Sequence, residues 1–501
     1  MSLKSQLRPL HMQLRQYDLY EELYLRVRSK AREKRDAAER KVVAAKMSAV
    51  RRTALLNEGK ASVVHTVMDT GDYVSAERIL EVLLADPETA TSSDVWEAKA
   101  NFHLAQGQHA ETQEVARDMI LKNLPIGHYY IAKSFFAQGD YAKTMQHIQA
   151  CLFAHPNHAD CIYLLADLAM QIQKPAMAQD LLQDLVETTN RPKSWLSLAN
   201  LVATDEDFLR MQKAWNHWHA KDGKGVYNKD SAEYLALGAM RVDNYPLAKE
   251  IWRNSLTRAA SVKGGFQSLK VRKPSYSSDR AETALADLNS AMRAAEIEMF
   301  LVSGTLLGCV RENKLLGHDK DIDVGIWSDV TADVLSAALN AAGKFLPLAS
   351  RSEHIVRLKH LNGIAIDIFY HYRDLEDYWH AGVKMKWSNT PFKLVSREFL
   401  GQEHLIPEDY DTYLQENYGD WHTPKIAFDS AFDTPNGTIL HKDEMVIHAF
   451  KGLQNACISG TQEAIALYLQ DLQGRGEGAF VTQFCKHLKK VDPITAQLCS
   501  V

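Results

Sequence analysis

Residues 303–327 read SGTLLGCVRENKLLGHDKDIDVGIW, and three aspartates occupy alternate positions within this stretch: Asp319, Asp321 and Asp323. In an extended strand, side chains two positions apart lie on the same face, so the intervening apolar residues point into a core. Carboxylates held this close repel one another unless a cation lies between them. A site built from oxygen ligands suits magnesium or manganese. The stretch therefore predicts a divalent metal site where a loop enters a strand.

Two other interpretations of the aspartates are possible. A calcium-binding EF-hand loop that begins at Asp319 needs glycine at its sixth position and glutamate at its twelfth. Those positions hold Val324 and Val330, so this interpretation is rejected. A solvated strand end is the other possibility, and only further signals nearby count against it.

The residues before the aspartates supply such a signal. Ser303, Gly304 and Thr305 follow an apolar strand-like segment and open an apolar helical one. A glycine turn at a helix start presents backbone N–H groups to a phosphate, and the two hydroxyls could add donors. Arg311 could reach the same phosphate as a planar, two-pronged donor. The sequence thus predicts a phosphate-binding turn beside the metal site.

A fourth carboxylate appears in GIAIDIF at residues 363–369. Asp367 would lie on the strand face opposite the neighbouring isoleucines, and an isolated charge among apolar residues needs a partner. Binding the metal would supply one. A salt bridge to Arg357 or Lys359 would supply another, and both interpretations stay open.

The first half of the chain contains an internal repeat. AQGQHAET at 105–112 recurs as AQGDYAKT at 137–144, and TGDYVSAERIL at 70–80 aligns with DNYPLAKEIW at 243–252. This pattern of small residues, a Gly-x-Tyr-type turn and bulky apolar residues resembles the tetratricopeptide repeat, in about five units over residues 60–260. Such repeats favour a docking surface for a protein or a glycan, or else a rigid spacer or an oligomerisation module.

Composition sets the remaining limits. The chain has 501 residues, is 46% hydrophobic and 24% charged, and carries a net charge of −5, which favours no nucleic-acid partner. Residues 1–52 contain 14 Lys or Arg and 6 Asp or Glu, a difference of +8. Apolar residues recur every three or four positions over 5–50. We expect a basic amphipathic helix that packs on its own chain or a partner, or that lies on an anionic membrane surface.

The expected location follows from absences in the sequence. No stretch approaches the roughly 18 apolar residues of a membrane span, and MSLKSQLRPLHMQL at the start lacks the features of a signal peptide. The six cysteines include no CxxC, which is typical of free thiols in a reducing compartment. We expect a cytoplasmic protein, with peripheral attachment to the inner face of a membrane as an option.

Helices and strands mix only in the second half of the chain. The expected fold class is α+β multidomain, with an all-α tetratricopeptide-like solenoid followed by a nucleotidyltransferase-like mixed α/β domain. The expected parts are a basic helix at 1–55, repeats at 56–260, a linker at 261–278, a catalytic domain at 279–440 and a C-terminal helical region at 441–501.

Several ordered motifs over residues 280–430 together resemble the LicD/fukutin family of phosphotransferases. Gly304–Gly308 with Arg311 matches its G-T-L-L-G-x-x-R segment, and the three aspartates match its Asp-x-Asp-x-Asp run. Asp367 opens an Asp-Ile-Phe motif, and IPEDYDTYLQENYGDWHTPK at 406–425 resembles the C-terminal signature. His318 and Lys320 depart from the common Trp-Asp-Asp-Asp, which puts the substrate in doubt. We expect His318, Tyr418 and Trp421 to serve in packing.

The resemblance implies a nucleotidyltransferase-like core and a reaction. A phospho-alcohol of the ribitol, glycerol or choline type would move from a CDP-activated donor to a sugar hydroxyl of a cell-surface glycan, such as a bacterial capsule, releasing CMP. Asp321 and Asp323, with Asp319, would hold Mg²⁺ or Mn²⁺ on the donor. Ser303, Gly304 and Thr305 would orient its phosphates, Arg311 would neutralise charge, and Asp367 would bind a second metal or act as general base.

Two functions of other kinds stay open. A nucleotidyltransferase would move NMP from an NTP and release pyrophosphate. A non-catalytic scaffold would use only the repeats or the N-terminal helix, for a protein partner or for self-association. The presence of all four aspartates and Arg311 argues against the scaffold.

Overall fold

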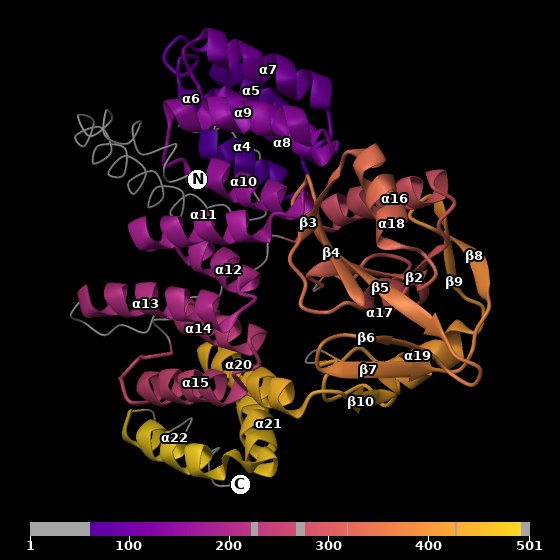
Figure 1. Ribbon diagram of the computed structural model, residues 1–501. Helices are drawn as coiled ribbons and strands as arrows, with labels where there is room; N and C mark the ends of the chain where they lie inside the picture. The colour runs from indigo at the N-terminus through magenta and orange to yellow at the C-terminus, as the bar shows by residue number, and fades with distance from the viewer. Residues whose placement is uncertain (1–60, 222–228, 267–275, 318, 426–427, 492–501) are drawn as a thin grey trace. The chain divides into compact units, whose positions relative to one another are not determined.

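The computed structural model describes residues 61–221, 229–266, 276–317, 319–425 and 428–491 (Figure 1). The chain forms two compact units. One unit comprises residues 1–161 with the short segments 276–280 and 361–363, and the other comprises 162–275, 281–360 and 364–501. The predicted basic helix at 5–50 and the predicted packing role of His318 lie outside the described residues.

The first half of the chain is helical, as predicted, and its helices follow one another in antiparallel pairs separated by short turns. In chain order they are α4 (Ala61–Met68), α5 (Tyr73–Ala85), α6 (Ser93–Ala105), α7 (His109–Leu121), α8 (Gly127–Ala137), α9 (Tyr141–Ala154), α10 (Ala159–Gln171), α11 (Pro175–Thr188), α12 (Pro192–Leu201), α13 (Asp205–Lys221), α14 (Lys229–Arg241) and α15 (Tyr245–Ala260).

The turn inside five of the pairs repeats one backbone conformation, and the turn between α12 and α13 does not. Gly71, Gly107 and Gly139 have φ angles of +88°, +71° and +73°, in the left-handed region that glycine enters without steric cost. Gln173 and Asp243 occupy the corresponding turns with φ of +56° each. The repeat seen in the sequence is therefore a repeated turn geometry, and two units reach it without glycine.

The residue after the turn often caps the second helix of a pair. Asp72, Asp140 and Asn244 each accept a hydrogen bond from the backbone N–H three positions later, which satisfies a donor that the helix itself leaves unpaired. Small side chains such as Ala98 and Ala132 are fully buried where helices meet. Turn, cap and small residue together confirm the tetratricopeptide-like architecture.

The second half of the chain builds a mixed sheet with helices. Its strands are β1 (Met299–Leu301), β2 (Asp321–Trp327), β3 (Phe345–Leu348), β4 (Ile355–His360), β5 (Ala365–Arg373), β6 (Tyr378–Ala381), β7 (Met385–Asn389), β8 (Leu394–Phe399), β9 (Gln402–Pro407) and β10 (Gly437–Ile439), and its helices are α16 (Ser278–Ala294), α17 (Ser303–Leu307), the π-helix η2 (Gly308–Glu312), α18 (Ala332–Ala342) and α19 (Tyr410–Tyr418). The expected α+β class is confirmed.

Strands β2 and β5 position the candidate site. They run parallel near the middle of the sheet, whose order is β10-β7-β6-β5-β2-β1-β9-β8, with β3 and β4 beside β5. Asp323 pairs in register with Asp367, and Ile322 and Ile366 are completely buried on the other face. Alternation along two paired strands thus places their aspartates on one face of the sheet.

Two uncharged histidines are buried on the face of the sheet that carries the aspartates. His371 of β5 and His380 of β6 stack with ring centroids 4.5 Å apart. Burial lowers the pKa of His371 to about 4 and lowers the pKa of His380 well below its ordinary value. Because an unfolded histidine titrates near pH 6.5, the unfolded state binds more protons than the folded state between pH 6.5 and 4.

Acidification over that window is therefore expected to destabilise the sheet domain. His371 alone should lower the free energy of unfolding by about 3 kcal/mol between pH 6.5 and 4. Urea unfolding followed by tryptophan fluorescence at several pH values measures this slope. The His371→Gln variant should show a shallower slope even if it is less stable overall, and an unchanged slope would contradict the assignment.

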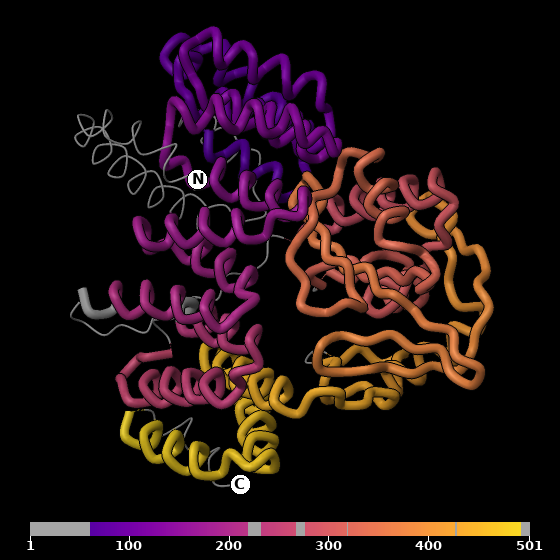
Figure 2. The backbone as a smooth tube through the Cα atoms, viewed as in Figure 1, coloured from indigo at the N-terminus to yellow at the C-terminus, as the bar shows by residue number. Residues whose placement is uncertain are grey.

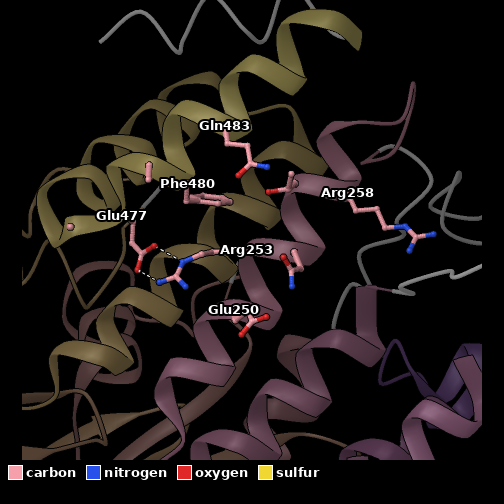
Figure 3. Close-up of a pocket in the computed structure, with 10 residues that line it drawn as sticks. Glu250, Arg253, Arg258, Glu477, Phe480 and Gln483 are labelled. Atoms are coloured by element: carbon pink, nitrogen blue, oxygen red, sulfur yellow. Dashed lines mark hydrogen bonds and ion pairs between the residues drawn. The ribbon is translucent and has the colours of Figure 1, made fainter.

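The C-terminal helices are α20 (Lys442–Ser459), α21 (Gln462–Leu472) and α22 (Gly478–Val491), with the π-helix η3 (Gln473–Glu477) before the last. Both α20 and α22 pack on α15 (Figure 2). Arg253 of α15 donates to both carboxylate oxygens of Glu477 at 2.7 Å, beside an open polar hollow (Figure 3). The predicted region at 441–501 thus shares contacts with the last repeat helix.

The predicted linker at 261–278 falls between two helices. Helix α15 ends at Ala260 and α16 begins at Ser278, and residues 267–275 of the linker lie outside the described part of the chain. None of the described helices combines the length and apolar character that crossing a membrane requires.

The cysteines partly differ from expectation. Cys151, Cys161 and Cys309 are free thiols, as expected. Cys485 is disulfide-bonded, so the expectation of six free thiols is wrong for this residue. Spacing along a sequence does not reveal which thiols a fold brings together.

Candidate active site

Three of the predicted carboxylates form one cluster. Asp321 and Asp323 of β2 and Asp367 of β5 each offer a carboxylate oxygen, and these oxygens lie within 4.8 Å of one another. All three side chains are partly buried. The parallel register of the two strands creates the cluster, because it sets Asp323 directly beside Asp367.

Without a bound cation, the carboxylates of the cluster repel one another. Loss of solvent, followed by the charges of Asp367 and Asp319, raises the pKa of Asp321 to about 6, and the guanidinium of Arg357 opposes this only in part. Loss of solvent and the neighbouring carboxylates also raise the pKa of Asp323 well above its ordinary value. Oxygen-only ligands with uncompensated negative charge fit a hard divalent cation such as Mg²⁺ or Mn²⁺.

Asp319 does not join this cluster, which differs from the prediction of four clustered carboxylates. It precedes β2, and one of its oxygens lies so close to Gly304 that a Cβ there would overlap it. The other accepts the backbone N–H of Lys320 at 3.1 Å. Strand alternation does not extend into the loop, so Asp319 acts on the site through its charge and Gly304 makes room for it. Lys320 itself is exposed.

The predicted phosphate-binding turn forms the start of α17. Ser303 and Gly304 are partly exposed there, and Ser303 has a φ of +47°, an unusual conformation for a residue with a side chain. Thr305 differs from the prediction, because it is 1% exposed and its Oγ1 accepts the backbone N–H of Asp323 at 2.9 Å. It therefore ties α17 to β2 instead of facing a ligand.

Removing that hydroxyl should loosen the site. We expect Thr305→Val to lower the free energy of unfolding by about 1–3 kcal/mol, because the buried N–H of Asp323 loses its acceptor. Chemical denaturation of the purified variant measures the loss. Thr305→Ser keeps the hydroxyl and is the matched control. A Thr305→Val protein as stable as the control would show that the hydrogen bond contributes nothing.

Arg311 also differs from the prediction. Its side chain on η2 is 12% exposed; Nη1 donates to the backbone oxygen of Trp421 at 3.2 Å, and Nη2 pairs with Glu312 at 3.1 Å. These partners hold the segment that follows α19 against η2. Nη1 and Nη2 are thus engaged within the protein, and a phosphate contact through them would require an exchange of partner, whereas Nε is buried and makes no hydrogen bond among the described residues.

Asp367 makes one of the two salt bridges that the sequence left open, and it also lies where it could bind a metal. It belongs to the carboxylate cluster, and its Oδ1 accepts a hydrogen bond from Nε of Arg357 at 3.1 Å. The antiparallel register of β4 and β5 places Arg357 opposite Asp367. The sequence predicted Arg357 only as a possible salt-bridge partner, and the register of β4 with β5 places it on the aspartate face.

Aromatic residues of α19 border the cluster. Burial and then the charge of Glu416, with a smaller effect of Asp323, raise the pKa of Tyr413. Burial and the charges of Asp323 and Asp319 raise the pKa of Tyr418 well above its ordinary value. Trp421 is buried, in keeping with the predicted packing role. Tyr413 had no assigned role, because its distance from the aspartates along the chain hides their proximity.

Comparison with known proteins shows which family this part of the chain is similar to. Residues 296–409 match the domain described as "LicD/FKTN/FKRP, nucleotidyltransferase domain", and residues 135–201 match a tetratricopeptide repeat. The ribitol-5-phosphate transferase FKTN of Mus musculus is 26% identical over 170 residues, which cover 31% of this chain and 36% of that protein. FKTN of Homo sapiens is 26% identical over 153 residues, which cover 28% and 32%.

The chain thus spans about a third of the length of the curated relatives that it matches. The matched region contains β1, α17, the cluster strands β2 and β5, and Arg357. Residues 296–409 are therefore similar to the nucleotidyltransferase domain of LicD, FKTN and FKRP, and residues 135–201 of the preceding helices are similar to a tetratricopeptide repeat.

Proposed function

We propose that this protein is a metal-dependent phosphotransferase. It moves a ribitol-phosphate-type group from a CDP-activated donor to a sugar hydroxyl of a glycan and releases CMP. The cluster of Asp321, Asp323 and Asp367 inside a LicD-type domain is the observation that carries this proposal. The FKTN relatives are named as ribitol-5-phosphate transferases, which favours ribitol phosphate over glycerol or choline phosphate.

The three carboxylates would hold Mg²⁺ or Mn²⁺. When bound, the cation would neutralise charge on the donor phosphates and on the departing CMP. We assign Asp367 to the ligand set and not to general base catalysis, because its oxygen lies within 4.8 Å of those of Asp321 and Asp323. Asp319 would contribute through its charge and through its contact with Gly304.

The other residues would position the donor and the acceptor. Ser303 and Gly304, at the partly exposed start of α17, would orient the donor phosphates. In the transfer, the acceptor oxygen bonds to phosphorus, the bond to the CMP oxygen breaks, and the hydroxyl proton passes to solvent. Phosphoryl transfer depends more on position and charge stabilisation than on a strong base. Tyr413 and Tyr418, held neutral beside the cluster, would exclude water from it.

The helical repeats are proposed to hold the acceptor glycan or a protein partner near the domain, and they could also mediate self-association. A location at the cytoplasmic face of a membrane stays part of this proposal, together with synthesis of a capsule-type glycan.

A donor panel tests the proposal. The purified protein is incubated with Mg²⁺ and, separately, CDP-ribitol, CDP-glycerol, CDP-choline and the four NTPs, with and without a glycan extract. CMP release from one CDP-alcohol supports the phosphotransferase and names its donor. Pyrophosphate release from an NTP would instead establish a nucleotidyltransferase, and silence across the panel from folded protein would favour the scaffold.

A further inference from the structure

Arg357 stands out among the cations near the cluster. Its Nε lies 3.1 Å from Oδ1 of Asp367, and its charge also acts on Asp321. The side chain is 43% exposed, whereas that of Asp367 is 17% exposed. Arg357 therefore connects a cluster carboxylate to the solvent-exposed surface.

The two arginines of the site differ in what they can offer a ligand. Arg311 is 12% exposed and uses Nη1 and Nη2 for Trp421 and Glu312. Arg357 uses Nε for Asp367, and among the described residues its Nη1 and Nη2 have no hydrogen-bond partner. Binding a phosphate in a two-pronged manner requires such free, parallel donors. Arg357 meets this requirement without losing an internal contact at its Nη groups.

The ion pair also competes with a cation for the same carboxylate. Asp367 contributes a carboxylate oxygen to the cluster. A divalent ion bound there would attract this carboxylate and weaken its ion pair with Arg357. An arginine without its partner beside a metal-bound diphosphate would gain a new anionic partner. Arg357 would then pair with Asp367 in the metal-free site and with the diphosphate when metal and donor are bound.

Resting on the proposed function, we propose that Arg357 is the arginine that binds the diphosphate of the nucleotide donor, and that it exchanges Asp367 for a donor phosphate when metal and donor bind.

Metal binding without donor is the first arm of the test. Titration calorimetry with Mn²⁺ alone should show roughly two- to fivefold tighter binding to Arg357→Gln than to the wild type, because the competing cation is gone and a partly exposed ion pair has this strength. Arg357→Lys keeps the charge and should bind Mn²⁺ like the wild type.

Nucleotide binding is the second arm. With Mn²⁺ saturating, Arg357→Gln should bind CDP about 10- to 100-fold more weakly, the strength of a charge-assisted hydrogen bond to phosphate. The kcat/KM for the active CDP-alcohol should fall by a similar factor. Arg357→Lys should recover only part of this loss, because an ammonium cannot donate in the two-pronged geometry.

The matched control is Arg373→Gln. Arg373 is 46% exposed, pairs with Asp329 at 2.9 Å, and lies six residues beyond Asp367 on β5, roughly 20 Å away. It should change neither arm. Opposite effects of Arg357→Gln on Mn²⁺ and on CDP support the proposal, since a merely structural role would weaken both.

Unchanged CDP binding in Arg357→Gln, or a joint loss of Mn²⁺ and CDP binding, would overturn the proposal. In that case the wild type still binds Mn²⁺ and releases CMP. If the proposed function itself is wrong, the wild type neither binds Mn²⁺ nor releases CMP. The assignment of Arg357 is then also wrong, and the wild-type result distinguishes this case from the first.

Discussion

Asp321→Asn is expected to reduce CMP release from the active donor by about 10²- to 10³-fold or more, the loss typical when a charge that stabilises a transition state is removed. The carboxylate lies in the cluster with Asp323 and Asp367, so its replacement removes a ligand and leaves its neighbours in place. Steady-state CMP release at saturating Mg²⁺ measures the effect.

The same substitution should not harm the fold. Because the folded-state pKa of Asp321 is raised to about 6, its ionised form opposes folding, and this penalty grows as pH rises from about 4 to 6 and is complete above. At pH 8 without metal, Asp321→Asn should therefore be more stable than the wild type by about 1–3 kcal/mol. A given concentration of Mg²⁺ should raise the melting temperature of the wild type more than that of the variant, because the variant binds the ion more weakly.

Asp329→Asn is the matched control for this experiment. Asp329 follows the same strand, and its side chain is 68% exposed. Its loss should alter neither turnover nor the effect of Mg²⁺. An Asp321→Asn enzyme with wild-type turnover, folded and pure, would rule out the metal role of Asp321.

Glu444→Gln is expected to cause the largest loss of stability, about 3–5 kcal/mol. Glu444 of α20 is 5% exposed, and its two oxygens accept hydrogen bonds from Arg351 at 2.8 and 2.7 Å. Tyr245 of α15 donates to the same carboxylate at 2.9 Å. Neutralising Glu444 leaves the guanidinium of Arg351 without its charge partner and loosens α20 from α15.

Denaturant unfolding of the purified variant measures this loss, with Glu463→Gln at an exposed position of α21 as the control. The paired change Glu444→Leu with Arg351→Met should recover much of the stability, since removing both charges avoids an unpaired one. A Glu444→Gln protein as stable as its control would show that the pair contributes little.

The fold could be predicted where the sequence pattern is local. The repeats were predictable from the turn glycines at 107 and 139. The two site strands were predictable from the alternation in DIDVGIW and GIAIDIF, because these signals depend on neighbouring residues. The contact of α15 with α20 and α22 could not be predicted in this way. It depends on helices far apart in the sequence, and no short-range pattern reports it.

The candidate site shows the same division. Asp321 and Asp323 follow from strand alternation, and Asp367 from its isolation among apolar residues. Asp319, Thr305 and Arg311 carry the right chemistry but have internal contacts: the first lies over Gly304, the second bonds to Asp323 and the third to Trp421. Only tertiary geometry shows which polar groups a protein uses for itself.

Mn²⁺ titration of the wild type and of four single variants tests the metal cluster most directly. Asp321→Asn, Asp323→Asn and Asp367→Asn should each weaken binding at pH 7.5 by about tenfold or more, the effect of losing one charged ligand, while Asp319→Asn should weaken it less. Equal Mn²⁺ binding by the wild type and the three cluster variants would contradict a catalytic metal site at these carboxylates.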